Sequence, residues 1–537
     1  MTIGEKIAKF RVERGISQEQ LAELTEVSRQ SVSKWEKGRA LPQLDKLSKL
    51  CELFGVSADE FLSEKPPLAD KGEVQKNKYF GTDGFRGEAG VGLTSMHAYQ
   101  VGRFLGWYFS QRGVAGKRGE RARIVIGKDT RLSSYMLEYA VAAGITSSGA
   151  DAHMLHVTTT PSVSYVTRVD GFDCGIMITA SHNPFCDNGI KVINRHGEKL
   201  DDETTALIEA YLDGDLGALG VSGKDLPLAD GERIGRIIDH VAGRNRYVGY
   251  LISLASHSYK HLRVGLDCAN GAAWSIAGAV FRALGAEITV VGDEPNGLNI
   301  NRACGSTHID RLCRLVKEKK LDVGFAFDGD CDRCLAVDEN GNVVDGDGIL
   351  YLLARRLKAR DMLKGDTVVD TVMSNSGLDM ALASCGIKCE HTAVGDRFVW
   401  ERMQEKDYSL GGEASGHIIL KKYATTGDGL LTAIMVAEEL CDTKRTLSVL
   451  TAGLELYPQL TKNLRVKDKD AVMGDAGVKA ALSEVEALIG GKGRALLRKS
   501  GTEPLIRIMI ESESEEACAA YADRIARAIE EGGHTLG

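Results

Sequence analysis

From Tyr79 onward the sequence alternates short apolar segments with stretches of helical periodicity, and this pattern constrains the fold most. Residues 123–127 are a predicted buried strand, and residues 135–149 are the helix that follows it. Residues 262–267 and 272–285 repeat the pair. Such alternation indicates parallel α/β units, which divide into three blocks of roughly 100 to 130 residues, a usual domain size.

The segments on either side differ in composition. Residues 64–78 are polar and contain two prolines, as a linker does. Residues 505–511 and 515–530 are a predicted strand and helix of a mixed C-terminal unit. We therefore expect a multidomain α/β protein. Its expected parts are an all-α module at 1–63, a linker at 64–78, three similar α/β domains at 79–215, 243–342 and 343–453, and an α+β domain at 457–537.

Bulk properties exclude several classes of protein. A chain of 537 residues is too long for one hydrophobic core. The net charge of −8 argues against general nucleic-acid binding by the whole molecule. The sequence shows no apolar run of membrane-spanning length and no secretory signal, so we expect a cytoplasmic protein without a membrane partner. Its twelve scattered cysteines are then predicted to be reduced thiols.

Ser181 follows a short buried strand at 176–178 and begins a Ser-His-Asn-Pro turn. A serine displayed on such a turn is either a helix cap or a nucleophile. Lys191 supplies a cation ten residues further on. A phosphorylated Ser181 would carry about two negative charges, which a nearby Mg²⁺ would favour.

Asp328, Asp330 and Asp332 stand at alternate positions, directly after a predicted strand. Carboxylates are the hard oxygen ligands that Mg²⁺ takes. A calcium-binding EF-hand is disfavoured because Arg333 stands where its loop needs glycine, and Asn340-Gly341 marks a β-hairpin. A solvated acidic turn is the other alternative, but three such carboxylates repel one another without a cation, so we favour a metal site.

Two cysteine pairs have a spacing that also permits zinc: Cys331 with Cys334, and Cys385 with Cys389. A four-thiolate zinc site is conceivable. Cys331, however, alternates with the aspartates and should face away from them. Structural thiols are therefore the favoured interpretation.

A turn at 499–504 joins two predicted strands and suits a phosphate dianion, although an ordinary hairpin turn is as good an interpretation of the turn alone. Hydroxyl, backbone N–H and guanidinium donors gather there: Arg498, Ser500, Gly501, Thr502 and Arg507. Glu413 and Ser415 stand two residues apart and could grip sugar hydroxyls. A displayed serine, an Mg²⁺ loop and an anion turn together indicate phosphoryl transfer.

These segments occur in one order and resemble the α-D-phosphohexomutase superfamily from about Tyr79 to the C-terminus. The motifs that carry the resemblance include GTDGFRG, IGKDTRLSSYMLE, TASHNPFCDNGIK, DGDCDR, VGDRFV, GEASGHIIL, YATTGDGLLTA and RKSGTEPLIR. IGKDTR, VGDRFV and YATTGDGLLTA look like the glucosamine-specific branch. The resemblance implies three similar α/β domains and a smaller fourth around one central cleft. It also implies interconversion of glucosamine 6-phosphate and glucosamine 1-phosphate.

The resemblance assigns roles to residues of this sequence. Ser181 resembles the phosphoserine, which with Asp328, Asp330 and Asp332 would hold Mg²⁺. Cations around the transferring phosphoryl group would be Arg86, Lys191 and Arg333, and His417, with Lys191, would be a candidate for proton transfer. Substrate contacts would come from Gly395, Asp396, Arg397, Glu413, Ser415, Arg498, Ser500, Gly501, Thr502 and Arg507. A hexosamine 1,6-bisphosphate would be the intermediate and activator.

Alternatives to the glucosamine enzyme are a phosphomannomutase or phosphoglucomutase, and a DNA-binding regulator that senses sugar phosphate. Cys331 departs from the family, which commonly has glycine or alanine at that position.

Residues 1–63 are a larger departure, because the usual mutase lacks them. Ser17 and Ser28 are predicted caps of two short helices, the second at 29–36. The module resembles the helix-turn-helix of Xre/Cro-type repressors. In that case Arg29, Gln30 and Ser31 would begin the recognition helix, and Arg29, Lys34, Lys37 and Arg39 would approach phosphates. Double-stranded DNA and a homodimer are the expected partners, and a helical dimerisation or docking module is the alternative.

Overall fold

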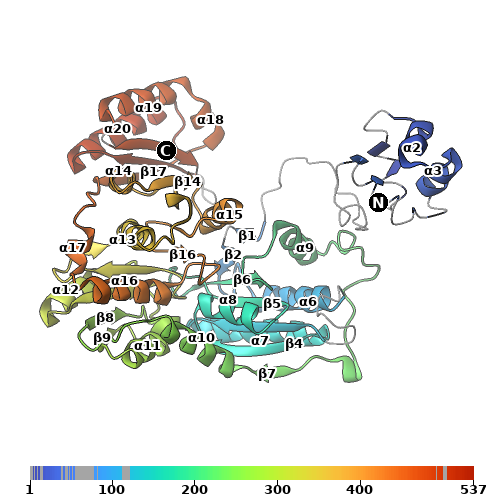
Figure 1. Ribbon diagram of the computed structural model, residues 1–537, viewed down its shortest axis with the longest axis horizontal. Coiled ribbons are helices and arrows are strands. Elements are labelled where there is room, and N and C mark those ends of the chain that lie inside the picture. The colour runs from blue at the N-terminus through green and yellow to red at the C-terminus, as the bar shows by residue number, and fades with distance from the viewer. Residues whose placement is uncertain are drawn as a thin grey trace. The chain divides into compact units, whose positions relative to one another are not determined.

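The computed structural model describes residues 78–81, 83–111, 121–491, 493–499 and 505–536, and in the N-terminal module 4, 7–8, 10–11, 16–37, 40, 42, 46, 49–50 and 53–54. The chain forms two compact units, Met1–Lys76 and Asn77–Gly537, each described by itself below (Figure 1). The expected linker at 64–78 lies outside the described residues apart from its last one. Among the described residues, no helix is long and apolar enough to cross a membrane.

The N-terminal unit contains α2 (Gln18–Thr25) and α3 (Arg29–Glu36). Both predicted caps are confirmed, since the Ser17 hydroxyl accepts from the Gln20 amide and the Ser28 hydroxyl from the Ser31 amide. The described core residues include Leu21 of α2 together with Val32 and Trp35 of α3. Packing of these side chains holds the two helices together and leaves the opposite side of α3 to solvent.

The first domain of the larger unit is a seven-stranded mixed sheet in the order β1-β2-β6-β5-β3-β4-β7. β3, β4, β5 and β7 run parallel, whereas β6, β2 and β1 join antiparallel. The strands are β1 Phe80–Gly81, β2 Gly84–Glu88, β3 Arg123–Lys128, β4 Asp151–Val157, β5 Cys174–Ile178, β6 Asp187–Asn194 and β7 Ile237–Asp239. Its helices are α6 Ser95–Gln111, α7 Leu132–Ser147, α8 Thr160–Val169 and α9 Asp202–Leu212. All five residues of β5 are buried, which explains its continuous apolar sequence.

The second and third sheets are smaller, in the orders β12-β11-β10-β8-β9 and β14-β13-β15-β16. One continuous core of buried side chains runs through both. The 3-10 helix η1 Gly231–Arg233 precedes β7 of the first sheet. The second domain contains α10 Val241–Ser253, β8 Arg263–Asp267, η2 Ala272–Ser275, α11 Ala277–Ala283, β9 Glu287–Val291, α12 Asp310–Lys319, β10 Val323–Phe327, β11 Cys334–Val337 and β12 Val343–Val344. The third contains α13 Gly346–Ala359, η3 Lys364–Asp366, β13 Thr367–Thr371, α14 Ser376–Ser384, β14 Lys388–Thr392, α15 Asp396–Lys406, β15 Leu410–Gly412, β16 Ile418–Leu420, α16 Gly429–Thr443 and α17 Leu447–Thr451.

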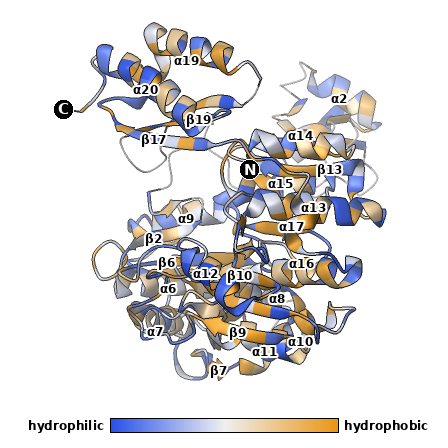
Figure 2. Ribbon diagram, turned by 90° about the vertical axis from the view of Figure 1, so that its left-hand side faces the viewer, coloured by the Kyte–Doolittle hydropathy of each residue, from blue (hydrophilic) through white to orange (hydrophobic). Residues whose placement is uncertain are grey.

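The C-terminal domain is an antiparallel sheet in the order β17-β19-β18, with helices on one face (Figure 1). Its elements are β17 Gln459–Arg465, α18 Lys469–Gly474, α19 Ala476–Ile489, β18 Arg494–Lys499, β19 Leu505–Glu511 and α20 Glu515–Glu531. Figure 2 shows hydrophobic and hydrophilic residues interleaved along α19 and α20. In α20, Cys518, Ala522, Ile525 and Ile529 are buried at helical spacing, as expected for a helix that covers a sheet.

Glycines allow α6 and α7 to pack at very short range. A Cβ on Gly144 would lie 2.2 Å from the Tyr99 carbonyl oxygen, and one on Gly102 would lie 2.2 Å from the Val141 carbonyl oxygen. Both obstacles are backbone atoms, which cannot swing aside as a flexible side chain can. The close packing of this helix pair therefore depends on glycine at both positions.

We predict that Gly144→Ala destabilises the first domain by about 1–3 kcal/mol, because the added methyl group forces the two helices apart. Scanning calorimetry of the full chain should show an earlier unfolding transition. Gly249→Ala on α10 is the matched control, since a methyl group added there would have no described atom within 4 Å. That substitution should leave the transition unchanged or raise it, and equal effects of the two changes would contradict the packing argument.

Candidate active site

Ser181 lies in the turn that follows β5, and only 1% of its surface is exposed. Its backbone is left-handed, with φ of +50°, a conformation that few residues other than glycine adopt. Its hydroxyl donates to Oδ2 of Asp328 at 2.5 Å. The structure thus brings the predicted serine and the predicted aspartate loop together, although 147 residues separate them in sequence.

Two buried side chains hold the Ser181 turn from behind. Arg131 donates to the carbonyl oxygens of Ser181 and Asn183, both at 2.9 Å. Asn301 donates to the same two oxygens at 2.8 and 3.0 Å. Gly329 leaves no spare room, because a Cβ there would lie 2.4 Å from the Ser181 carbonyl oxygen. These contacts stabilise the unfavourable φ of Ser181 and fix the direction of its hydroxyl.

The three aspartates follow β10 and are all buried. One oxygen from each lies within 4.8 Å of the others, and Oδ1 of Asp330 and of Asp332 has no hydrogen-bond partner among the described residues. Burial and then repulsion from Asp332 and Asp330 raise the pKa of Asp328 well above its usual value. Three buried carboxylates with two unpartnered oxygens among the described residues indicate that the loop is built around a cation. Cys331 has φ of +60°, a left-handed conformation that glycine adopts more readily than other residues.

Lys191 on β6 is the central cation of the site. Its ammonium lies 2.9 Å from Asp330, 3.0 Å from Asp332 and 3.2 Å from Asp83. Burial alone would lower the pKa of Lys191, but the attraction of these carboxylates outweighs it and raises the pKa well above its usual value. Lys191 is therefore held as a cation by these three carboxylates.

The other predicted cations flank the same space. Arg86 on β2 pairs with Asp83 and donates to Oδ1 of Asn183 at 3.3 Å, while its Nε has no partner in the described part of the chain. The backbone amide of Arg333 donates to Asp328 at 3.1 Å, and the Arg333 Nε lies 4.0 Å from Asp332. Arg86 therefore lies at the Ser181 turn, and Arg333 lies at the aspartate loop.

His417 is buried between two carboxylates. Its Nδ1 lies 3.8 Å from Asp332, and its Nε2 lies 3.4 Å from Asp396. The Gly427 amide donates to Nε2 at 2.9 Å, so the neutral ring carries its proton on Nδ1, facing Asp332. Burial opposes protonation, but Asp396 and Asp332 outweigh it and raise the pKa of His417.

The predicted sugar-binding residues line the third domain's side of the site. Oε1 of Glu413 accepts from the Gly395 amide at 3.2 Å, and the buried Ser415 hydroxyl has no partner among the residues described. Arg397 instead pairs with Asp202 and Glu401, so its charge is already compensated. One pocket connects Asp396 and Arg397 to Asp332 of the aspartate loop, and its lining also includes Phe80, Asp83, Thr160 and Lys191.

Arg498 on β18 and Arg507 on β19 are direct cross-strand partners. Burial and then repulsion from Arg507 lower the pKa of Arg498. The Nε of each arginine is buried and finds no partner within the described ranges. Like charges at facing positions are unfavourable unless an anion lies between them, which fits the predicted phosphate site. Ser500, Gly501 and Thr502 of that site lie outside the described residues.

Sequence reasoning missed Asp83, Thr160, Arg131 and Asn301. The Thr160 hydroxyl donates to Asp330 at 2.5 Å, from the first residue of α8. Arg131 could have been predicted, because it lies three residues after the end of β3. The carboxyl ends of parallel strands meet at one edge of a sheet, where binding sites form. Asn301 ends the family-like motif GLNIN, but its role could not be predicted, since it reaches the Ser181 turn from the second domain.

Comparisons with known proteins agree with this arrangement. Family models described as phosphoglucomutase/phosphomannomutase domains I, II, III and IV match residues 77–216, 245–341, 345–457 and 462–528. A helix-turn-helix model matches residues 7–61. A phosphoglucosamine mutase of Lachnospira eligens is 56% identical over 459 residues, which cover 86% of this chain and 100% of that protein. The Bacillus subtilis phosphoglucosamine mutase is 47% identical over 84% of this chain and 98% of its own length.

Solved structures show the same fold. A phosphoglucomutase/phosphomannomutase family protein of Burkholderia thailandensis superposes with a TM-score of 0.70 at 24% identity, covering 86% of this chain and 100% of its own. Aspergillus fumigatus N-acetylphosphoglucosamine mutase, solved with GlcNAc-6P and magnesium, gives a TM-score of 0.58 at 18% identity over 87% of this chain and 97% of its own.

We predict that Asn301→Gly loosens the Ser181 turn. Glycine tolerates the φ of +57° at this position but removes both donated hydrogen bonds. Losing buried hydrogen bonds costs about 1–3 kcal/mol, so amide hydrogen exchange at residues 179–189 should rise about tenfold to a hundredfold. Asn299→Gly is the control, because Asn299 donates to Glu294 instead. Unchanged protection in Asn301→Gly would show that Asn301 does not restrain the turn.

Proposed function

The chain belongs to the phosphoglucomutase/phosphomannomutase family, and its relatives mark it as an isomerase that transfers a phosphoryl group within its substrate. From this premise we propose that it interconverts glucosamine 6-phosphate and glucosamine 1-phosphate through phosphorylated Ser181 and a hexosamine 1,6-bisphosphate. The observation that carries the proposal is the contact between the Ser181 hydroxyl and Asp328. It supports a phosphoryl carrier placed directly beside a metal-binding loop.

The residues fit Mg²⁺. Asp328, Asp330, Asp332 and the Ser181 hydroxyl offer only oxygen ligands, and two of the carboxylate oxygens have no partner among the described residues. When bound, Mg²⁺ would neutralise part of the negative charge on the transferring phosphoryl group.

The transfer itself breaks the bond between phosphorus and Ser181 Oγ and forms one to the free sugar hydroxyl. Lys191, Arg86 and Arg333 place positive charge around the phosphoryl oxygens throughout. The proton of the sugar hydroxyl must reach Ser181 Oγ as the phosphoryl group leaves it, and we propose that His417, with Lys191, passes this proton on. The bisphosphate then turns over in the pocket and returns its other phosphoryl group to Ser181.

The substrate must be held by the phosphate that does not react. Arg498 and Arg507 supply two facing guanidinium groups for it, and Glu413 and Ser415 would grip the sugar hydroxyls. Because either phosphate can occupy the arginine site, one set of contacts serves both half-reactions. The C-terminal domain would close during catalysis so that the bisphosphate turns without escaping.

We predict that Ser181→Ala abolishes turnover, because no hydroxyl remains to carry the phosphoryl group. Folding should be retained, since the turn is held through backbone carbonyl oxygens. The assay compares glucosamine, glucose and mannose phosphates, and intact mass before and after phosphatase treatment reports the phosphoserine. Wild-type turnover in Ser181→Ala would overturn the mechanism, and a preference for mannose or glucose phosphate would identify the runner-up enzymes.

We also propose that the N-terminal unit binds double-stranded DNA. Arg29, Gln30 and Lys34 of α3 are exposed, as is its C-cap Lys37, whereas Val32 and Trp35 are buried. Helix-turn-helix modules place the start of such a helix in the major groove and usually act as dimers, which suggests a homodimer.

We predict that the full chain selects a specific site from random duplexes and that binding weakens with salt. In Lys34→Ala, the slope of log binding constant against log salt concentration should become shallower by about 0.9, because one phosphate contact is lost. Lys260→Ala, an exposed change of equal charge on the larger unit, is the control. If no sequence is selected, or if both variants behave alike, the module is a docking element instead.

A further inference from the structure

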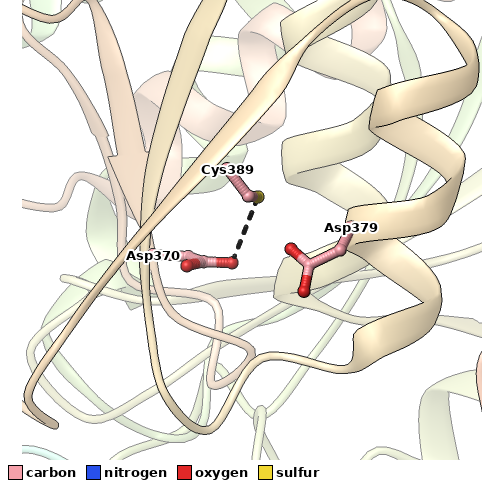
Figure 3. Close-up of side chains that lie close together, drawn as sticks. All are labelled: Asp370, Asp379 and Cys389. Carbon is pink, nitrogen blue, oxygen red and sulfur yellow. Dashed lines mark hydrogen bonds between the residues drawn. The ribbon is translucent and has the colours of Figure 1, made fainter. Parts of the chain in front are cut away.

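A second group of metal-ligating side chains lies at the edge of the third sheet. Asp370 is the penultimate residue of β13, Asp379 projects from α14, and Cys389 lies on the edge strand β14, so three elements contribute (Figure 3). His391 lies two residues after Cys389 on the same face of β14 and is the parallel partner of Asp370. None of these four residues lines the catalytic pocket.

The donor atoms are already close to a metal-binding geometry. Ligand atoms of Asp370, Asp379 and Cys389 all lie within 4.8 Å of one another, and Figure 3 shows the three side chains pointing toward a common point. The Cys389 sulfur lies 3.5 Å from Oδ2 of Asp370. In tetrahedral zinc sites, bonds of about 2.3 Å to sulfur and 2.0 Å to oxygen place those two atoms about 3.5 Å apart.

Without a metal ion, protons occupy this cluster. Nδ1 and Nε2 of His391 lie 2.5 Å from Asp370 and 3.2 Å from Asp379. These two hydrogen bonds raise the pKa of His391 to about 10. Burial and then the neighbouring carboxylates raise the pKa of the Cys389 thiol. Oδ1 of Asp379 is nevertheless buried without a hydrogen-bond partner among the described residues, so the protonated cluster leaves one acceptor unused.

We propose that Asp370, Asp379, Cys389 and His391 form a binding site for a thiophilic divalent transition metal, with Zn²⁺ the best fit. Sulfur, imidazole and carboxylate ligands suit Zn²⁺, whereas Mg²⁺ prefers oxygen alone, so the ion chemistry differs from that of the aspartate loop. On binding, the thiol and imidazolium protons are released to solvent. The close pair Cys385 and Cys389 thus contributes one ligand, and Cys385 is outside the group.

A metal ion at this site would link α14 to strands β13 and β14 at the edge of the sheet. Asn375, the N-cap of α14, exchanges hydrogen bonds with the backbone of Tyr457, at 2.9 and 3.0 Å. Ser376 donates to Glu511 of β19 from both its amide and its hydroxyl. A metal ion bound at Asp379, one turn further along α14, would therefore stabilise the helix that carries the C-terminal domain.

The experiment titrates metal-free full-length protein with Zn²⁺ under a competing chelator, with excess Mg²⁺ present to occupy the aspartate loop. We expect one tight equivalent, and Co²⁺ in its place should give a thiolate-to-metal charge-transfer band. Cys389→Ser should abolish that band and weaken Zn²⁺ binding about a hundredfold or more, since even outer-sphere losses cost tenfold to a hundredfold.

Cys385→Ser is the matched control and should bind as the wild type does. Asp379→Asn should weaken Zn²⁺ binding and keep the Co²⁺ band at high metal concentration. The proposal fails if the wild type binds Zn²⁺ no more tightly than Cys389→Ser does, or if Co²⁺ binds without a thiolate band. Either result would mean that the cluster holds no metal ion and is stabilised by the hydrogen bonds of His391 to Asp370 and Asp379.

Discussion

The organisation of the active site depends on the cost of burying three carboxylates on one loop. Asp328, Asp330 and Asp332 have almost no contact with water, and they repel one another. Such a group is stable only with positive charge beside it. Lys191 provides part of that charge, and the oxygens without partners among the described residues leave room for a divalent ion. The Ser181 hydroxyl donates to one of these carboxylates, Asp328, so a phosphoryl group carried by Ser181 would lie beside the same loop.

The fold positions Ser181, which has a strained backbone conformation, so that its hydroxyl reaches the aspartate loop. Ser181 has a left-handed backbone, and residues from two domains, Arg131 and Asn301, hold its carbonyl oxygen. The hydroxyl is thereby directed at Asp328 instead of being free to rotate with the turn. Strain of this kind is stored at functional sites where the surrounding contacts over-determine the conformation. Orientation is thus supplied by scaffold contacts to the backbone, while charge is supplied by the aspartate loop and its cations.

Many of these structural features could be predicted from the sequence, because local residue patterns indicate them. The strand at 323–327 and its aspartates, the serine turn and the caps of α2 and α3 all follow from periodicity and residue type. The helix predicted at 272–285 is instead η2 followed by α11, since Ile276 breaks the regular pattern between them. Asp83 and Asn301 were missed because their roles arise only from long-range contacts. Cys389 was noticed through a cysteine spacing, but its neighbours Asp370 and Asp379 come from β13 and α14, which no linear motif reveals.

The most direct test of the central claim is a crystal structure of the full chain with Mg²⁺ and glucosamine 1,6-bisphosphate. We expect Mg²⁺ at about 2.0–2.1 Å from oxygens of Asp328, Asp330 and Asp332, with a phosphoryl oxygen carried by Ser181 or the sugar completing the set. An ion located away from this loop, or a bisphosphate bound with neither phosphate near Ser181, would contradict it.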